Sequence, residues 1–179
     1  MIAPTDRTDE VTGTLDECPL DPEALNTLIR VCPGLLLDGE SAPAHAVGAR
    51  IASFWLPDEV AVYIGRAGQA VGARVRQYYR TPIGAPKPHA GGWWIKTLRV
   101  LPELWVDWAR TPRYVAAEEE MLRHFSANVS PESRAALPPG PVMPWANLVH
   151  PQEGRKAHGI RNATSAATGS ARRSPTTPP

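Results

Sequence analysis

Apolar residues recur at helical spacing in several parts of the chain, and each recurrence predicts a helix. Asp21-Pro22-Glu23 supplies an N-cap and a proline suited to a first turn, and Leu25, Leu28 and Ile29 follow on one face. This helix should end near residue 32. Further helices are predicted over residues 68–80, 93–98 and 111 to about 125.

Three other apolar stretches have the composition of strands. Residues 50–56 and 60–65 are separated by a short Pro-Asp-Glu turn, which predicts a hairpin. Residues 104–109 alternate apolar and polar positions like a third strand. The fold class expected from this order is α+β, with a small mixed or antiparallel three-stranded sheet flanked by helices. A short apolar segment at 35–37 and a loop over 38–48 precede it.

Composition divides the chain into four parts. Residues 1–20 are acidic and are expected to be disordered, 21–48 form an accessory helix and loop, and 49–161 form the main domain. Prolines make the chain irregular after residue 126, and residues 162–179 are a tail of small and polar residues, also expected to be disordered.

The formal net charge of +1 conceals an uneven distribution. Residues 1–40 carry nine acidic and two basic side chains, whereas the remainder carries 17 basic and nine acidic ones, a net charge of +8. This asymmetry fits an anionic partner such as DNA, although charge alone describes a solvated surface equally well. No apolar run is long enough to span a bilayer and no secretory signal is evident, so a cytoplasmic protein without a membrane partner is expected, with Cys18 and Cys32 as reduced thiols.

The motif that points to a reaction lies in residues 62–79. It reads Val62-Tyr63-Ile64-Gly65-Arg66-Ala67 and continues as Arg74-Val75-Arg76-Gln77-Tyr78-Tyr79. Together with the element order, this pattern resembles the GIY-YIG nuclease superfamily over residues 50–148, in the version found in bacterial excision-repair incision nucleases. The resemblance implies a metal-dependent DNA endonuclease. It also implies catalytic roles for Tyr63, Arg66, Arg74 and Tyr78.

The spacing of these residues is chemically coherent. Arg74 and Tyr78 are four apart and share a helix face. Hydrolysis of a phosphodiester needs positive charge on the pentacoordinate phosphate and an acceptor for the proton of water. Arg74 would supply the charge and Tyr63 would accept the proton, provided that a nearby cation such as Arg66 or the metal lowers its pKa.

The resemblance also indicates a metal ligand and an asparagine. When the last helix is aligned with that of the family, Glu118 takes the position of the metal ligand. Glu119 and Glu120 are then expected at the surface. One carboxylate with waters and a phosphate oxygen suits Mg²⁺, and Mn²⁺ would serve as well. Asn128 has the nearer spacing for the asparagine, but Asn147 lies among apolar residues and is favoured to hydrogen-bond a catalytic loop.

The sequence departs from the family at the first motif, where a tyrosine about ten residues before Tyr63 is expected. This stretch instead contains Phe54 and Trp55. Either Tyr63 suffices as the base and one of these aromatic residues fills the space, or catalysis is weakened. The alternative function is therefore a catalytically silent module of the same fold that binds DNA or a protein.

Contacts with DNA are expected from cations outside the proposed cleft. Trp93 or Trp94 is a candidate to stack on a base, although one of the two is expected in the core. The domain is small, which leaves room for a partner protein or a dimer to contribute specificity. The candidate DNA-binding residues are Arg76, Arg80, Lys87, His89, Lys96, Arg155 and Lys156.

Overall fold

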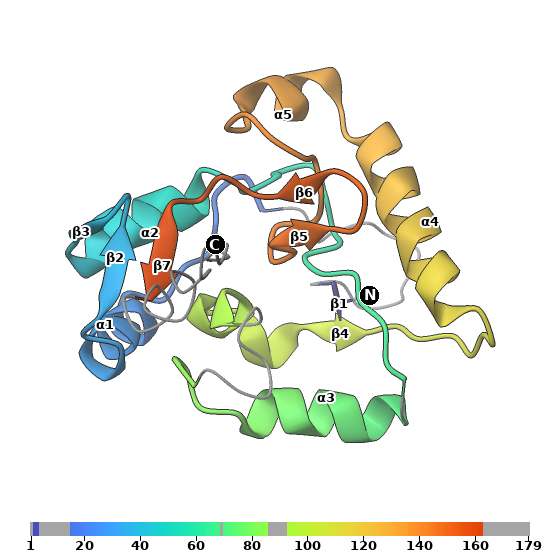
Figure 1. Ribbon diagram of the computed structural model, residues 1–179, viewed down its shortest axis with the longest axis horizontal. Coiled ribbons are helices and arrows are strands. Elements are labelled where there is room, and N and C mark those ends of the chain that lie inside the picture. The colour runs from blue at the N-terminus through green and yellow to red at the C-terminus, as the bar shows by residue number, and fades with distance from the viewer. Residues whose placement is uncertain (1, 4–14, 69, 86–92, 163–179) are drawn as a thin grey trace, which may run out of the picture.

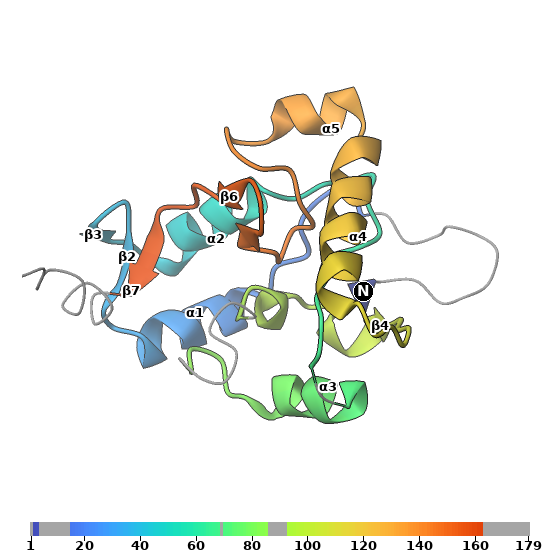
Figure 2. The ribbon, with the colours of Figure 1, turned by 45° about the vertical axis from the view of Figure 1, so that its right-hand side comes forward.

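The computed structural model describes residues 2–3, 15–68, 70–85 and 93–162, and it has a mixed α+β architecture (Figure 1 and Figure 2). The helices are α1 Pro22–Val31, α2 Ala44–Ala52, α3 Val71–Arg80, α4 Tyr114–Asn128 and α5 Pro131–Ala136, with 3-10 turns η2 Ile95–Thr97 and η3 Leu101–Glu103. The strands are β1 Ile2–Ala3, β2 Leu35–Leu37, β3 Glu40–Ser41, β4 Trp105–Val106, β5 Val149–His150, β6 Gly154–Arg155 and β7 Ile160–Asn162. Disorder was predicted for residues 1–20 and 162–179. Of these, residues 2–3 form β1, the Pro19 carbonyl accepts from the Arg99 amide at 2.9 Å, and residue 162 ends β7, so these parts are structured. Residues 1, 4–14 and 163–179 lie outside the described residues.

The strands form small antiparallel sheets. β2 lies between β3 and β7, β1 pairs with β4, and β5 pairs with β6. A three-stranded sheet is therefore present, but it is built from residues 35–37, 40–41 and 160–162 and from none of the three predicted strands. Of those, only 104–109 contains a strand, the two residues of β4.

Residues 50–56 are not a strand, and the prediction of a hairpin with residues 60–65 is wrong. The helix α2 occupies 44–52 and two turns follow it. Alanine, the strongest helix former, recurs in the preceding segment, and the buried Val47, Ile51 and Phe54 have helical spacing. The apolar run that resembled a strand is the end of a helix that began within the predicted loop.

Residues 60–65 are extended but pair with the C-terminal part of the chain. The Ala146 amide donates to the Val62 carbonyl at 2.8 Å. Figure 1 shows the segment between α2 and α3 passing between β5 and α4 before it enters α3. Residues 60–65, predicted as the second strand of the hairpin, contain no named strand, and the partner of Val62 is more than 80 residues away in the sequence.

The predicted helices are present with shifted ends. α1 has the expected cap, because the Glu23 amide donates to Asp21 Oδ1 at 2.9 Å. α3 and α4 occupy most of the predicted 68–80 and 111–125, and a 3-10 turn lies within 93–98. The short α5 was not predicted. Ser130 caps it and Pro131 occupies its first turn, so the proline that suggested irregular chain instead begins a helix.

Two groups of buried residues hold these elements together. The larger joins α1, α2, the η2 region and the C-terminal segment around the fully buried Trp94 and Trp145. Trp94 is thus the core member of the tryptophan pair, whereas Trp93 is half-buried. The smaller group packs Leu122 and Phe125 of α4 against residues 56–64 and 142–143. α1, predicted as an accessory helix, contributes Leu25 and Leu28 to the larger core.

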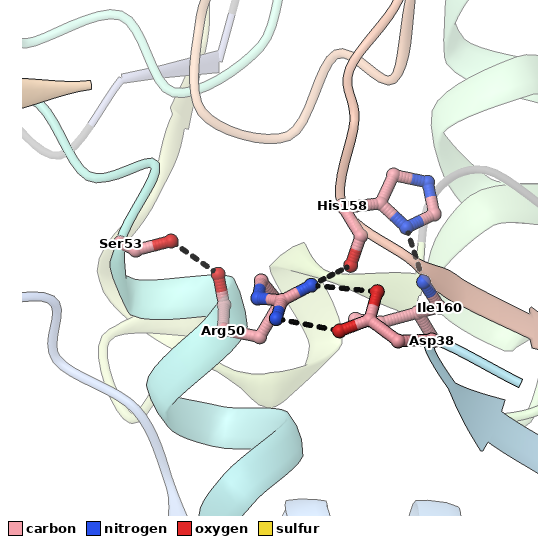
Figure 3. Close-up of polar contacts among 5 residues, drawn as sticks. All are labelled: Asp38, Arg50, Ser53, His158 and Ile160. Carbon is pink, nitrogen blue, oxygen red and sulfur yellow. Dashed lines mark hydrogen bonds and ion pairs between the residues drawn. The ribbon is translucent and has the colours of Figure 1, made fainter. Parts of the chain in front are cut away.

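The C-terminal segment is attached to the N-terminal half by polar contacts (Figure 3). The Arg50 guanidinium donates to both oxygens of Asp38, at 2.8 and 3.1 Å, and to the His158 carbonyl at 3.1 Å. A β-carbon on Gly159, which has a φ of +68°, would lie 1.9 Å from Asp38 Oδ1. Glycine is therefore required at 159, where the chain passes the Arg50–Asp38 pair and enters β7.

In the described part of the chain, no helix combines the length and the apolar character needed to cross a membrane.

Candidate active site

The loop that carries the motif is fixed by a side-chain amide. Asn147 Oδ1 accepts from the Ile64 amide at 2.9 Å, and Asn147 Nδ2 donates to the Ile64 carbonyl at 2.7 Å. This pair of bonds imitates one step of a β-ladder, and Asn147 is itself buried. The predicted contact between Asn147 and the loop is confirmed. Asn128 instead lies exposed at the end of α4 and donates to the His124 carbonyl.

Tyr63 folds back over the next glycine of the motif. A β-carbon on Gly65 would lie 2.5 Å from both Cε1 and Oη of Tyr63. The phenol ring therefore covers the backbone at Gly65, where any other residue would displace it. Asn147 and Gly65 together determine where the Tyr63 hydroxyl is placed.

α4 brings a carboxylate to this loop. Glu118 Oε2 lies 3.3 Å from Arg66 Nε, and the Arg66 backbone N–H also donates to this carboxylate. Only 16% of the Glu118 side chain is exposed, compared with 73% for Glu120, while Glu119 is half-buried. The choice of Glu118 among the three glutamates, made from the sequence, is therefore consistent with its low exposure in the structure.

α3 brings the remaining candidate residues to the loop. Arg74 is close enough to lower the pKa of Tyr63 through its charge, and Glu118 is close enough to raise it. The Tyr78 pKa is raised by burial and then by Tyr63, so the two phenols are close enough to interact electrostatically. Residues of three distant segments, 63–66, α3 and α4, therefore lie within electrostatic range of Tyr63.

The protonation of Tyr63 differs from the expectation. Burial, followed by the charge of Glu118, raises its pKa above the usual value, and the opposing effect of Arg74 does not compensate. The condition set from the sequence, a Tyr63 pKa lowered by a cation such as Arg66 or the metal, is not met in the protein alone, because burial and Glu118 raise this pKa by more than Arg74 lowers it. Because burial also raises the Glu118 pKa, this site disfavours negative charge and would gain from a bound cation.

The residues at the site partly fit the metal expected from the sequence. A single carboxylate of low exposure faces the phenol, which is a donor set that Mg²⁺ accepts when waters and a phosphate supply its other ligands. Within the described ranges, no group of three or more His, Cys, Asp and Glu side chains is arranged to hold an ion. Glu118 would therefore be the protein ligand, and its ion pair with the half-exposed Arg66 would have to open.

Phe54 and Trp55 do not take the place of the missing tyrosine. Phe54 is buried against Trp94, with ring centroids 5.8 Å apart. Trp55 is half-buried, and its indole N–H donates to the Leu15 carbonyl at 2.7 Å. Both serve the larger core, because the segment that carries them ends a helix and is not a strand beside Tyr63.

The predicted DNA-binding residues differ in their exposure and contacts. Arg76, Arg80 and Arg155 are exposed and available to phosphates. Lys96 is half-buried, donates to the Thr81 carbonyl and lies over the Tyr78 ring, so its ammonium supports α3. Lys87 and His89 lie outside the described residues.

Lys156 is only 5% exposed, and the prediction that it binds DNA is wrong. Its Nζ donates to the Pro144 and Trp145 carbonyls at 2.9 and 2.7 Å, and lies 5.5 Å from the centre of the Phe54 ring. Burial lowers its pKa well below the usual value. No local sequence signal indicates this burial, since a lysine in a basic turn usually faces solvent.

Replacing Lys156 with methionine is expected to lower the free energy of unfolding by about 1–3 kcal/mol. The methionine fills most of the space, but the two buried carbonyls lose their donor. Urea unfolding of the parent and the variant measures the difference. Arg155→Met is the matched control and should change stability by less than about 0.5 kcal/mol, because Arg155 is exposed. Equal effects of the two substitutions would show that the buried contacts of Lys156 contribute nothing.

Comparison of the chain with family profiles, curated proteins and solved structures found no match.

Proposed function

We propose that this protein is a metal-dependent endonuclease that hydrolyses DNA phosphodiester bonds at the site formed by Tyr63, Arg74 and Glu118. The observation that carries the proposal is the contact of Glu118 on α4 with Arg66, three residues after Tyr63, at 3.3 Å. The charges of Glu118 and of Arg74 on α3 both act on the Tyr63 phenol, so a cation, a carboxylate and a hydroxyl from three segments lie within electrostatic range of one another. The GIY-YIG-like motif and register in the sequence select these same residues, which supports the proposed activity.

Each side chain has a distinct task in the proposed reaction. Arg74 would place its charge against the phosphate oxygens as the pentacoordinate phosphate forms. Tyr63 would hold the attacking water through its hydroxyl, and Tyr78 would support the Tyr63 ring. Arg66 would turn from Glu118 to the phosphate when DNA binds. Bound at Glu118, a divalent cation would supply Lewis-acid chemistry and lower the pKa of nearby water.

The exposed cations on the outside of the site would position DNA. Arg76 and Arg80 lie on α3 beside the proposed catalytic face, and Arg155 lies on β6. Arginine suits this purpose because its planar guanidinium can donate two parallel hydrogen bonds to a phosphate. Such contacts bind the backbone of DNA without reading its sequence.

The second candidate is a catalytically silent module that binds DNA or a protein at the same site. The Arg66–Glu118 ion pair favours it, because the one carboxylate proposed to hold a metal already has a cation. A bound arginine cannot generate a hydroxide as a metal does. In this case the site would recognise its ligand through charge alone.

A plasmid-nicking assay separates the two. Supercoiled plasmid is incubated with the full chain and Mg²⁺ or Mn²⁺, and an EDTA reaction serves as the control. The nuclease is expected to produce open-circular DNA only with a divalent ion. Absence of product with either ion, together with binding that weakens steeply as salt rises, would contradict the nuclease and support the silent module.

A further inference from the structure

A hollow of about 470 Å³ lies against the face of α3 that adjoins the proposed catalytic face. Its volume is within the range of sites that hold small organic groups. Two aromatic rings, Tyr79 of α3 and Trp108 beyond β4, form part of the lining. The lining residues are Val71, Gly72, Val75, Arg76, Tyr79, Val106 and Trp108.

The aromatic rings of this hollow face solvent. Trp108 is 64% exposed and Tyr79 is 42% exposed, which is unusual for side chains of this size. Tyr79 is nevertheless held in place, because its ring meets the Tyr78 ring edge-on with centroids 6.0 Å apart. An exposed but oriented aromatic ring is a surface on which a flat group can stack.

Arg76 lines the hollow and is exposed, and Asp107 stands between the lining residues Val106 and Trp108 in the sequence. α3 carries Arg74, Arg76 and Arg80 and no acidic residue. Between residues 66 and 113 the chain has nine Lys and Arg against two Asp and Glu. Aromatic rings among cations are the features that bind single-stranded nucleic acid, where bases stack and phosphates meet arginines. An aliphatic groove for a protein helix would not need this excess of charge.

Helix geometry relates the hollow to the proposed site of cleavage. Arg74 and Tyr78 lie on one face of α3. Val75 and Tyr79 each follow by one residue, so they lie on the adjacent face of the helix. A helix with its side chains is about 10–12 Å across, and stacked nucleotides are spaced by about 3.4 Å. A strand crossing α3 from Arg74 toward Tyr79 would therefore place a base in the hollow at most about three nucleotides from the phosphate at Arg74.

We infer that this hollow binds an unpaired nucleobase, so that the substrate is DNA with a single-stranded segment beside the scissile phosphate. The inference rests on the proposed function for the location of the cut, whereas the binding itself does not require cleavage. Tyr79 and Trp108 stack on the base, and Arg76 binds an adjacent phosphate. Fully paired DNA has no base free to enter, so it binds through its backbone only.

Anisotropy of short fluorescein-labelled DNA, measured with the full chain in EDTA, tests this binding without cleavage. Trp108→Ala is expected to weaken binding of a mixed-sequence single strand by about 5- to 140-fold, the range for losing one stacked base. Binding of the matched duplex should change by less than about twofold, because its stacked bases make no use of Trp108.

Trp105→Ala is the matched control, since Trp105 is 51% exposed on β4 but does not line the hollow. It should leave the affinities for both DNAs unchanged. Circular dichroism of each variant verifies the fold. The inference is overturned if Trp108→Ala and Trp105→Ala have the same effect, or if parent and Trp108→Ala bind the single strand equally.

The nicking assay distinguishes failure of this inference from failure of the proposed function. If Trp108→Ala selectively loses single-strand binding and the parent does not cleave DNA, base binding at the hollow is supported and the endonuclease activity is rejected. If the parent cleaves DNA with a metal and Trp108→Ala has unchanged affinity for the single strand, the endonuclease activity is supported and base binding at the hollow is rejected.

Discussion

Arg74→Ala should reduce the rate of DNA cleavage by about 10³-fold or more, which is the contribution of an arginine that stabilises a phosphoryl transition state. The fold should survive, because every residue of α3 is at least partly exposed. Single-turnover cleavage with enzyme in excess measures the chemical step apart from DNA binding. Parent and variant are compared at saturating protein and the same Mg²⁺ concentration.

The control for Arg74 is Arg123→Ala on α4. Arg123 is exposed and pairs with Glu120 at 3.8 Å, so its loss should leave the single-turnover rate unchanged. Similar rates for Arg74→Ala and Arg123→Ala would reject the assignment of Arg74.

Glu118→Gln tests the other half of the same site. Glutamine keeps the shape of the side chain but removes the charge that would hold a metal, a contribution worth several kcal/mol, so a loss on the order of 10³-fold is expected. Glu120→Gln removes a charge from the same helix where it is exposed, and should have no effect. If Glu118→Gln cuts as fast as Glu120→Gln, the metal does not bind where we propose.

The second large effect is expected for Asn147→Ala, which should lower the free energy of unfolding by about 2–5 kcal/mol. The substitution leaves the N–H and the carbonyl of Ile64 buried without partners, and each unpaired group costs about 1–3 kcal/mol. Urea unfolding at neutral pH measures the change. Cleavage should also fall below what the folded fraction explains, because Tyr63 directly precedes the released Ile64 and Arg66 follows it by two residues.

Asn128→Ala is the control for this prediction. Asn128 is exposed, and its side chain makes one hydrogen bond, to the His124 carbonyl within α4. Its loss should change stability by less than about 0.5 kcal/mol. Equal destabilisation by Asn147→Ala and Asn128→Ala would mean that the amide contacts with Ile64 do not hold the loop.

Much of the candidate site could be predicted because its signals are chemical and local. Arg74 and Tyr78 share a face of α3 wherever that helix lies, since their spacing alone determines this. Asn147 was recognisable as a polar residue within an apolar segment, where a buried amide has to find partners. The pKa of Tyr63 was not predictable, because it depends on burial and on the balance of Glu118 against Arg74.

Local sequence determined the helices of this protein. Asp21 caps α1 and Ser130 caps α5 through contacts within three residues, and such contacts form whatever the rest of the chain does. Spacing along α3 and the register of Glu118 on α4 are equally local. These features are properties of neighbouring residues and carry over into any fold.

Tertiary structure alone decided which extended segments pair and which charges are buried. Residues 60–65 have the composition of a strand, but their hydrogen bonds go to Ala146 and Asn147, which a local pattern cannot specify. Lys156 has the sequence context of a surface cation, yet the carbonyls and rings of distant residues enclose it. Pairing and burial depend on contacts between segments far apart in the chain, whose free energy appears only when the core closes.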